Sequence, residues 1–397
     1  MLIYEKKILN ALNKYKLIIL FWLITIISLC MRITGLPFHS GDMDFCLIKW
    51  FNEINNLGYE ALKTQVGDYN IPYQLIIFIL TKLHLAAILS YKFVSIFFDY
   101  SSAITAGLIS VLLNQNSQKK YVHFVASYSF VLFSPLVIFN SSFWGQADSI
   151  YSFFAITSLY FILKNKTLVS FIFLGIAFAF KLQTIFLLPI FVLIYLIKKN
   201  YSIIYFGIIP IMMYILSIPG LLAGRNLLSP FTIYLNQTSS YKSMSMNTPN
   251  FWSLFSLNDY SHLHVLATLI SLGIILLGLG YIWTTNSDIS NEIILALAIW
   301  CIWTCVMFMP SMHERYNYIS EILVLAMCSY QKKYAIVAVC MIVPIITCYS
   351  RYLFHYENYS IYIANSALYL FGYLLLSYWI FGSKRFSHQE VKADCKK

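Results

Sequence analysis

Charged residues are scarce in this chain, and no long polar block interrupts it. Asp, Glu, Lys and Arg make up 11% of the 397 residues, whereas 59% are hydrophobic and the mean hydropathy is +0.70. Soluble domains usually carry about 25% charged residues. The composition therefore excludes an ordinary soluble protein, and the lack of a polar block excludes a separate soluble catalytic domain.

Paired cysteines and a cleavable leader are also missing. The eight cysteines show no CxxC spacing and most lie inside apolar runs, which predicts neither a metal site nor a disulfide framework. The first apolar run, about 17–33, has no small-residue cleavage site, so we expect a retained membrane anchor. The net charge of +11 is spread over the ends of apolar runs, which favours membrane topology over nucleic-acid binding.

Apolar runs of about 20 residues recur along the chain, the length that a helix needs to cross a bilayer. They predict an all-α, polytopic integral membrane protein with about 12 transmembrane helices. The expected spans are 17–35, 88–113, 121–139, 148–163, 167–180, 184–198, 201–222, 263–282, 292–309, 316–331, 334–349 and 361–382.

Basic residues decide which loops face the cytoplasm. Most of the 27 Lys and Arg residues fall near 6–16, 119–120, 164–166, 198–199 and 332–333 and in the tail. Because cytoplasmic loops are rich in Lys and Arg, these are the predicted inside loops. The N-terminus (1–16) and the tail (383–397) are then cytoplasmic, and the large loops 36–87 and 223–262 are extracytoplasmic.

The segment Ile71–Ile88 is apolar enough to be a further span, but counting it would reverse every later loop. We therefore expect a helix lying on or dipping into the outer leaflet. A second amphipathic helix is expected at Phe45–Leu57. Both belong to the first extracytoplasmic loop.

Five polar motifs fall on the predicted outer side, and their convergence suggests an active site. They are Gly41-Asp42-Met43-Asp44, Asp68-Tyr69-Asn70-Ile71-Pro72, Trp144-Gly145-Gln146-Ala147-Asp148-Ser149, Lys181-Leu182-Gln183 and Met312-His313-Glu314-Arg315. Asp42 and Asp44 offer a general base towards a hydroxyl or a holder for a divalent metal. The alternative is a helix N-cap, formed by Ser40, Asp42 or Asp44.

His313 and Arg315 together offer several donors for a phosphate, against the alternative of an Arg that snorkels to lipid headgroups. Lys181 and Gln183 fit either a site or a polar hairpin turn. Gln146, Asp148 and Asn140 fit either a site or the cap of the following helix. Asp99 lies inside the second span, where we expect a neighbouring helix to satisfy it.

These motifs, in this order, resemble the GT-C superfamily of integral-membrane glycosyltransferases, which use polyprenyl-phosphate-linked sugars. Gly41–Asp44, Asp68–Pro72, Asn250-Phe251-Trp252 and Met312–Arg315 resemble stretches of dolichyl-phosphate-glucose glucosyltransferases. Trp144–Tyr151, Phe180–Gln183 and Pro189 are similar to bacterial proteins related to the GPI mannosyltransferases. The resemblance covers about residues 32–325 and implies a GT-C-like fold.

The resemblance implies a role for each matching residue. Asp42 would deprotonate the acceptor hydroxyl with help from Asp44, or the pair would hold a divalent ion if one is used. His313, Arg315 and Lys181 would bind the carrier phosphate. The expected substrate-binding residues are Gln183, Trp144, Gln146, Asp148, Asp68, Tyr69 and Glu314. Attack without a second nucleophilic carboxylate would invert the anomeric centre.

The expected function is transfer of one hexose, glucose- or mannose-like, from a polyprenyl-phosphate carrier to a glycan or lipid-linked glycan. The expected partners are this donor, this acceptor and membrane lipids, without nucleic acid. The expected location is the outer face of a cell membrane. Heavy usage of Ile, Lys, Asn, Tyr and Phe fits an AT-rich bacterial genome, which favours a bacterial cytoplasmic membrane and undecaprenyl phosphate over dolichyl phosphate as the carrier. An O-antigen-type polymerase and a lipid-linked sugar transporter stay open as alternatives.

Overall fold

The computed structural model describes residues 3–115, 118–238, 241–356 and 358–382, and these residues are helical without any β-sheet. Helices of π or 3-10 type are marked η. The elements are α1 (Ile3–Ile33), η1 (Met43–Leu47), α2 (Ile48–Leu57), η2 (Gly58–Lys63), α3 (Ile71–Thr81), α4 (Ala87–Leu113), α5 (Lys120–Leu132), α6 (Pro135–Ile138), η3 (Phe139–Trp144), α7 (Asp148–Leu163), α8 (Thr167–Phe180), η4 (Leu182–Leu187), α9 (Leu188–Lys198), η5 (Ile203–Gly207), α10 (Ile208–Leu222), α11 (Ser229–Thr238), α12 (Phe251–Leu254), α13 (Tyr260–Thr285), α14 (Asn291–Phe308), η6 (Glu314–Asn317), α15 (Tyr318–Tyr330), α16 (Tyr334–Phe354) and α17 (Tyr359–Phe381).

Each of the twelve predicted spans falls on a helical segment, but their lengths differ. Within the described residues, 7 helices are long and apolar enough to cross a membrane, or 8 if the bent pair α5 and α6–η3 counts as one span. The segments α7, α8 and η4–α9 are apolar but shorter. The chain is thus a membrane-embedded helical protein, and the count of 12 spans is not confirmed.

The third predicted span, 121–139, is broken rather than straight. The chain bends by 53° between Leu132 and Pro135. A residue that precedes proline avoids the helical region, and Ser134 accordingly has an extended backbone (ψ 123°). This bend starts the short helical segment α6–η3, which ends at Trp144.

The two helices expected in the first outer loop are present with shifted boundaries. The helix expected at Phe45–Leu57 starts earlier, as the π-helix η1, and continues as α2. The segment expected at 71–88 is helical only as α3, whose 11 residues rise about 16 Å, so it is too short to cross a bilayer alone.

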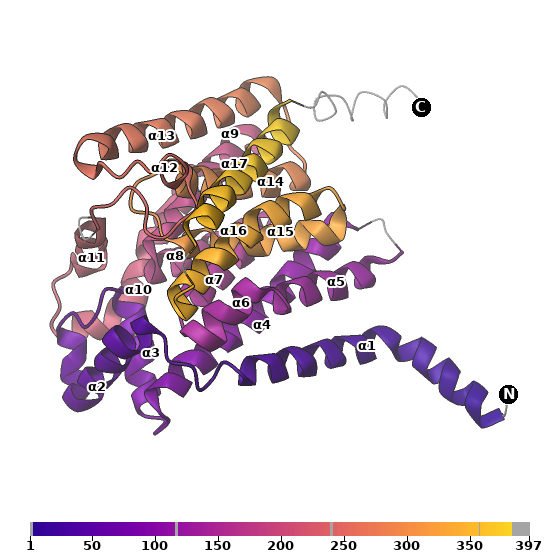
Figure 1. Ribbon diagram of the computed structural model, residues 1–397, viewed down its shortest axis with the longest axis horizontal. Coiled ribbons are helices and arrows are strands. Elements are labelled where there is room, and N and C mark those ends of the chain that lie inside the picture. The colour runs from indigo at the N-terminus through magenta and orange to yellow at the C-terminus, as the bar shows by residue number, and fades with distance from the viewer. Residues whose placement is uncertain (1–2, 116–117, 239–240, 357, 383–397) are drawn as a thin grey trace.

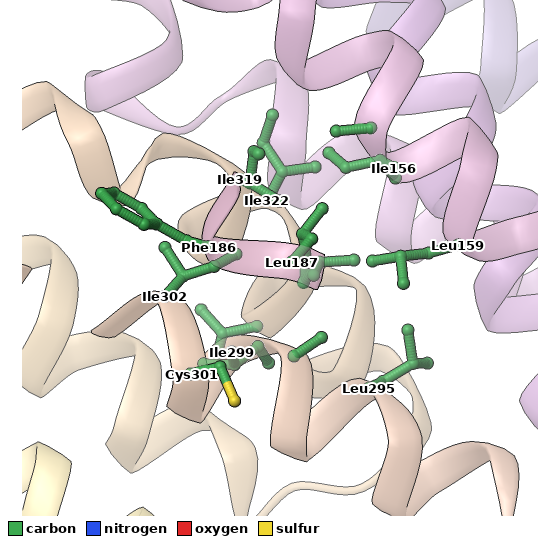
Figure 2. Close-up of a cluster of buried hydrophobic side chains, with 14 of the residues drawn as sticks. Ile156, Leu159, Phe186, Leu187, Leu295, Ile299, Cys301, Ile302, Ile319 and Ile322 are labelled. Carbon is green, nitrogen blue, oxygen red and sulfur yellow. The ribbon is translucent and has the colours of Figure 1, made fainter. Parts of the chain in front are cut away.

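The core lies where the short helix η4 enters the bundle. Figure 2 shows Phe186 and Leu187 of η4 between Ile156 and Leu159 of α7, the residues Leu295 to Ile302 of α14, and Ile319 and Ile322 of α15. Leu187 is fully buried there. Lipid tails are as apolar as these side chains, so close packing rather than water exclusion holds such helices together within a bilayer.

A buried ion pair connects α1 with this bundle. The Arg32 guanidinium donates from Nε and Nη2 to Asp99 Oδ2 of α4, both at 3.1 Å, and both side chains are fully buried. Ser141 and Tyr318 also donate to the Asp99 carboxylate. The expectation that a neighbouring helix satisfies Asp99 is confirmed.

Contacts bring together loops that contain predicted inside basic residues. At one end, His123 of α5 contacts the Ser329 carbonyl of α15 (2.6 Å), and Asn200 donates to Asn165 between two other loops (3.0 Å). Figure 1 shows the beginning of α1 and the end of α17 on the same right-hand side, and α2, α3, α11 and α12 on the left. The motifs at 41–44 and 68–72 belong to the starts of η1–α2 and α3, on this left-hand side.

Candidate functional site

Asp42 lies at the start of η1, and its carboxylate is held by three uncharged donors from elsewhere in the chain. Trp144 Nε1 donates to Oδ2 at 2.9 Å and Gln146 Nε2 donates to the same oxygen at 2.7 Å. The Tyr352 hydroxyl of α16 donates to Oδ1 at 2.5 Å. Ser40 instead caps the helix, accepting from the Met43 amide at 3.2 Å. The capping alternative for Asp42 is therefore wrong.

Asp44 points to a different partner. Its Oδ1 lies 2.7 Å from His39 Nδ1, and about half of each side chain is exposed. The two carboxylates of the D-x-D pair thus bind separate groups. Within the described residues, no cluster of three or more His, Cys, Asp or Glu side chains is placed to hold a metal ion.

A tight turn brings Trp144, Gln146 and Asp148 to Asp42. Gly145 adopts a left-handed conformation (φ 73°), and a Cβ on it would lie 2.8 Å from Met43 Cε. Only glycine satisfies both conditions without strain. The turn at Gly145 therefore lets the residues on either side of it lie next to Asp42. Trp144 is itself fully buried.

Asp148 and Lys181 form a buried ion pair. Lys181 Nζ donates to Asp148 Oδ1, and Asn140 Nδ2 donates to Oδ2 at 3.3 Å. The rings of three tyrosines (Tyr69, Tyr151 and Tyr316) surround the ammonium with centroids 5.2–5.6 Å away. Burial lowers the pKa of Lys181, although Asp148 opposes this shift. Lys181 is therefore no exposed hairpin residue.

Arg315 connects Asp42 with Asp148. Its Nη1 lies 3.9 Å from Asp42 Oδ2, and its Nε lies 3.6 Å from Asp148 Oδ2. Its guanidinium also stacks over the Trp144 ring, 5.0 Å from the centroid, and Nη1 contacts Glu314 Oε1 at 3.3 Å. Arg315 is 12% exposed, which excludes a side chain that snorkels freely to headgroups.

His313 and Glu314 complete this group (here called the charged cluster: Asp42, Asp148, Lys181, Glu314 and Arg315, flanked by His313). The His313 ring lies edge-on to the rings of Tyr241 and Tyr316, and its Nε2 has no hydrogen-bond partner among the described residues. Burial, followed by the charges of Arg315 and Lys181, keeps the pKa of His313 well below its usual value. Burial raises the pKa of Glu314 to about 7, against the pull of Arg315.

The remaining predicted site residues divide into those that join the cluster and those that stay apart. The Tyr69 hydroxyl donates to Gln146 Oε1 at 3.1 Å, so Tyr69 joins. Asp68 is exposed, and its backbone carbonyl accepts from Gln237. The Gln183 Oε1 atom is buried without a hydrogen-bond partner in the part of the chain that the structure describes.

The loop containing Asn250-Phe251-Trp252 supports the cluster rather than entering it. Asn250 caps α12 by accepting from the Ser253 amide at 3.0 Å, and Trp252 Nε1 donates to the Phe308 carbonyl at 2.8 Å. The Met246 amide donates to the Met312 carbonyl at 3.0 Å, next to His313. This pairing holds the residues 312–315 in place.

Sequence reasoning missed Tyr352 and Tyr349, both on α16. Tyr352 stacks on Trp144 with ring centroids 4.6 Å apart, and the Tyr349 hydroxyl accepts from Asn140 Nδ2 at 3.2 Å. The predicted span ended at 349, whereas α16 continues to Phe354 and carries Tyr352 to Asp42. No protein-family model matches this chain, and no curated protein matches it significantly.

Proposed function

We propose that this protein is a membrane glycosyltransferase that moves one hexose from a polyprenyl-phosphate carrier to a glycan or lipid-linked glycan. One observation carries the proposal. A carboxylate held by three uncharged donors, Asp42, faces the guanidinium of Arg315 at one end of a membrane-embedded helical bundle. This geometry fits a general base opposite a group that binds a phosphate.

The reaction needs both elements. The proton of the acceptor hydroxyl passes to the Asp42 carboxylate while the hydroxyl oxygen bonds to the anomeric carbon. The bond between that carbon and the phosphate oxygen breaks, and its electron pair leaves with the polyprenyl phosphate. Positive groups placed where this charge develops, here Arg315 and Lys181, lower the barrier. Attack from the side opposite the phosphate inverts the anomeric centre.

The charge balance of the cluster sets a condition on phosphate binding. Lys181 and Arg315 face three carboxyl groups, those of Asp42, Asp148 and Glu314. With Glu314 protonated, the two cations balance two carboxylates, and a phosphate can then displace the weaker contacts of Arg315 at 3.6 and 3.9 Å. Donor binding is therefore expected to favour neutral Glu314.

An apolar groove on the first outer loop and α4 suits the carrier lipid. It has a volume of about 390 Å³ and lies between α3 and α4, with Ile79, Phe93 and Phe97 exposed along it. Ile77 and Leu80 of α3 share one buried core with Met43, the neighbour of Asp42. An isoprenoid chain in this groove would approach the cluster from the bilayer side, as a lipid-borne substrate requires.

The test is transfer by the purified protein in lipid nanodiscs. Radiolabelled polyprenyl-phosphate glucose and polyprenyl-phosphate mannose are offered as donors, with lipid-linked glycans extracted from membranes of the native host as acceptors. Addition of one hexose supports the proposal. Growth by whole oligosaccharide units from diphosphate-linked donors would indicate a polymerase instead. Movement of labelled lipid across proteoliposomes without any transfer would indicate a transporter.

A further inference from the structure

A cavity beside Tyr352, the residue whose hydroxyl donates to Asp42 Oδ1, is unused by the proposed phosphate site, because no residue of the charged cluster lines it. It has a volume of about 920 Å³, near the upper end of the range of about 300–1,000 Å³ that is usual for small-molecule sites. Its walls come from three parts of the chain, residues 39–45, 245–258 and 351–362. Both outer loops and the ends of α16 and α17 thus enclose it.

Tyr352 joins this cavity to the catalytic carboxylate. Its side chain forms part of the cavity wall, and its hydroxyl donates to Asp42 Oδ1. Ser40 and Gly41, which directly precede Asp42, also line the cavity. Oδ2 is instead occupied by Trp144 and Gln146 and faces Arg315. The two oxygens of Asp42 therefore have separate partners, and the partner of Oδ1 is the one that lines the cavity.

The cavity wall also contains a buried hydrogen-bond acceptor that is left open. Asn247 Nδ2 donates to the Cys348 carbonyl at 2.9 Å, which fixes the amide, and Asn247 Oδ1 is buried without a hydrogen-bond partner among the described residues. A buried polar atom left unsatisfied is costly, so a donor that reaches this oxygen from the cavity would be favoured.

The chemistry of the wall matches a sugar. Four serines (Ser40, Ser245, Ser253 and Ser256) and two asparagines (Asn247 and Asn258) line it together with aromatic rings, including Tyr352 and Tyr362. A sugar presents hydroxyls that both donate and accept, and C–H faces that pack on aromatic rings. The wall offers partners of both kinds.

We propose that this cavity binds the acceptor glycan, with the reacting hydroxyl on Asp42 Oδ1 in place of Tyr352 and a neighbouring hydroxyl on Asn247 Oδ1. This inference rests on the proposed function. The acceptor then enters from the loops while the donor phosphate lies on the Arg315 side. Tyr352 is a positioning residue, which holds the Asp42 carboxylate until the acceptor hydroxyl replaces it.

Blocking the cavity tests the inference. His355 lines the cavity and is exposed, so a H355C variant in a background without native cysteines can be labelled with a bulky, membrane-impermeant maleimide. We expect the labelled protein to lose transfer to the extracted lipid-linked glycans, while it still binds polyprenyl-phosphate glucose or mannose. The matched control is S261C, exposed on the first turn of α13 and outside the cavity wall. Its labelling should leave transfer unchanged.

The N247G variant provides the second measurement. Asn247 has a positive φ of 57°, which glycine adopts freely, so the change removes the amide without straining the backbone. Loss of one hydrogen bond predicts a rise in the acceptor KM of about 2- to 10-fold with the donor KM unchanged. Equal changes in both constants would indicate a structural role for the amide and count against the inference.

The outcomes separate this inference from the proposed function. Transfer at the parent rate by labelled H355C would overturn the acceptor assignment while leaving the glycosyltransferase standing. Loss of transfer on labelling, with donor binding retained, supports the assignment. An absence of transfer by the parent protein with every donor would overturn the proposed function, and the acceptor site with it.

Discussion

Replacement of Asp42 by Asn tests the proposed base with little change in shape. Trp144 and Gln146 both donate to Oδ2, so the amide oxygen of Asn can take that position. The amide nitrogen then faces the Tyr352 hydroxyl, which can accept as well as donate a hydrogen bond. The variant thus keeps its three partners and loses its basicity.

The expected loss follows from the role of the carboxylate. A positioned general base contributes roughly 10²- to 10⁴-fold to a rate, so D42N should lose at least about 100-fold in turnover. Donor binding should change little, because Nη1 of Arg315 lies 3.9 Å from Asp42 and keeps its closer contact with Glu314. The assay is hexose transfer in nanodiscs, run beside a separate measurement of donor binding.

The control for this change is D44N. Asp44 contacts only the half-exposed His39 among the hydrogen-bond partners that the structure gives its side chain, so a metal-free mechanism predicts a mild effect. Equal losses in D42N and D44N, together with sensitivity to a chelator, would indicate a shared divalent ion. Normal turnover by correctly inserted D42N would refute the reasoning, because the carboxylate would then be structural.

Three further predictions concern the charges and the topology. K181M alone should unfold or misinsert the protein, because breaking a buried ion pair costs about 3–5 kcal/mol. The double variant K181M/D148N should recover folding, as measured by thermal shift. Wild-type donor affinity in this double variant would show that Lys181 does not belong to the phosphate site. The donor KM should rise as the pH passes about 7, because Glu314 has a pKa raised by burial to about 7 and carries its negative charge above that pH. E314Q should flatten this pH profile. A profile that E314Q leaves unchanged would contradict the role of Glu314. In intact cells, an impermeant maleimide should label S261C and spare K120C, whereas labelling of K120C alone would reverse the topology.

The positions of the helices could be predicted from the sequence because polar residues bound the apolar runs sharply. The predicted spans 148–163 and 167–180 coincide with α7 and α8. The bend at Pro135 was readable as well, since proline restricts the residue before it, but the apolar run continued past it and suggested one span. Periodicity alone does not reveal a break inside an apolar run.

Part of the site could be predicted for a similar reason. Polar and charged side chains at the ends of apolar spans are costly unless they have a function, and Asp42, Asp148, Lys181 and Arg315 do meet. Tyr352 could not be found in this way, because it is one of 31 tyrosines in the chain. Arg351 and its polar neighbours also lower the hydropathy of the sequence after residue 349. The predicted span therefore ended before the last turn of α16.

The difference in exposure between the two central carboxylates explains why Asp42, and not Asp148, is the candidate base. Asp148 is fully buried; Lys181 occupies its Oδ1, and Asn140 and Arg315 approach its Oδ2. An acceptor hydroxyl has no access to either oxygen. Asp42 is 29% exposed, and among the residues that the structure describes its Oδ1 accepts a hydrogen bond only from Tyr352, which lines the cavity.

In the proposed mechanism, Asp148 therefore acts through the cations that it holds. Without its charge, Lys181 and Arg315 lose the carboxylate that fixes them relative to Asp42, so D148N should chiefly raise the donor KM. D42N should instead lower kcat, because it removes a group needed in the transition state and not in donor binding. A loss of kcat in D148N that equals the loss in D42N, with donor KM unchanged in both, would mean that the two carboxylates act as one catalytic unit.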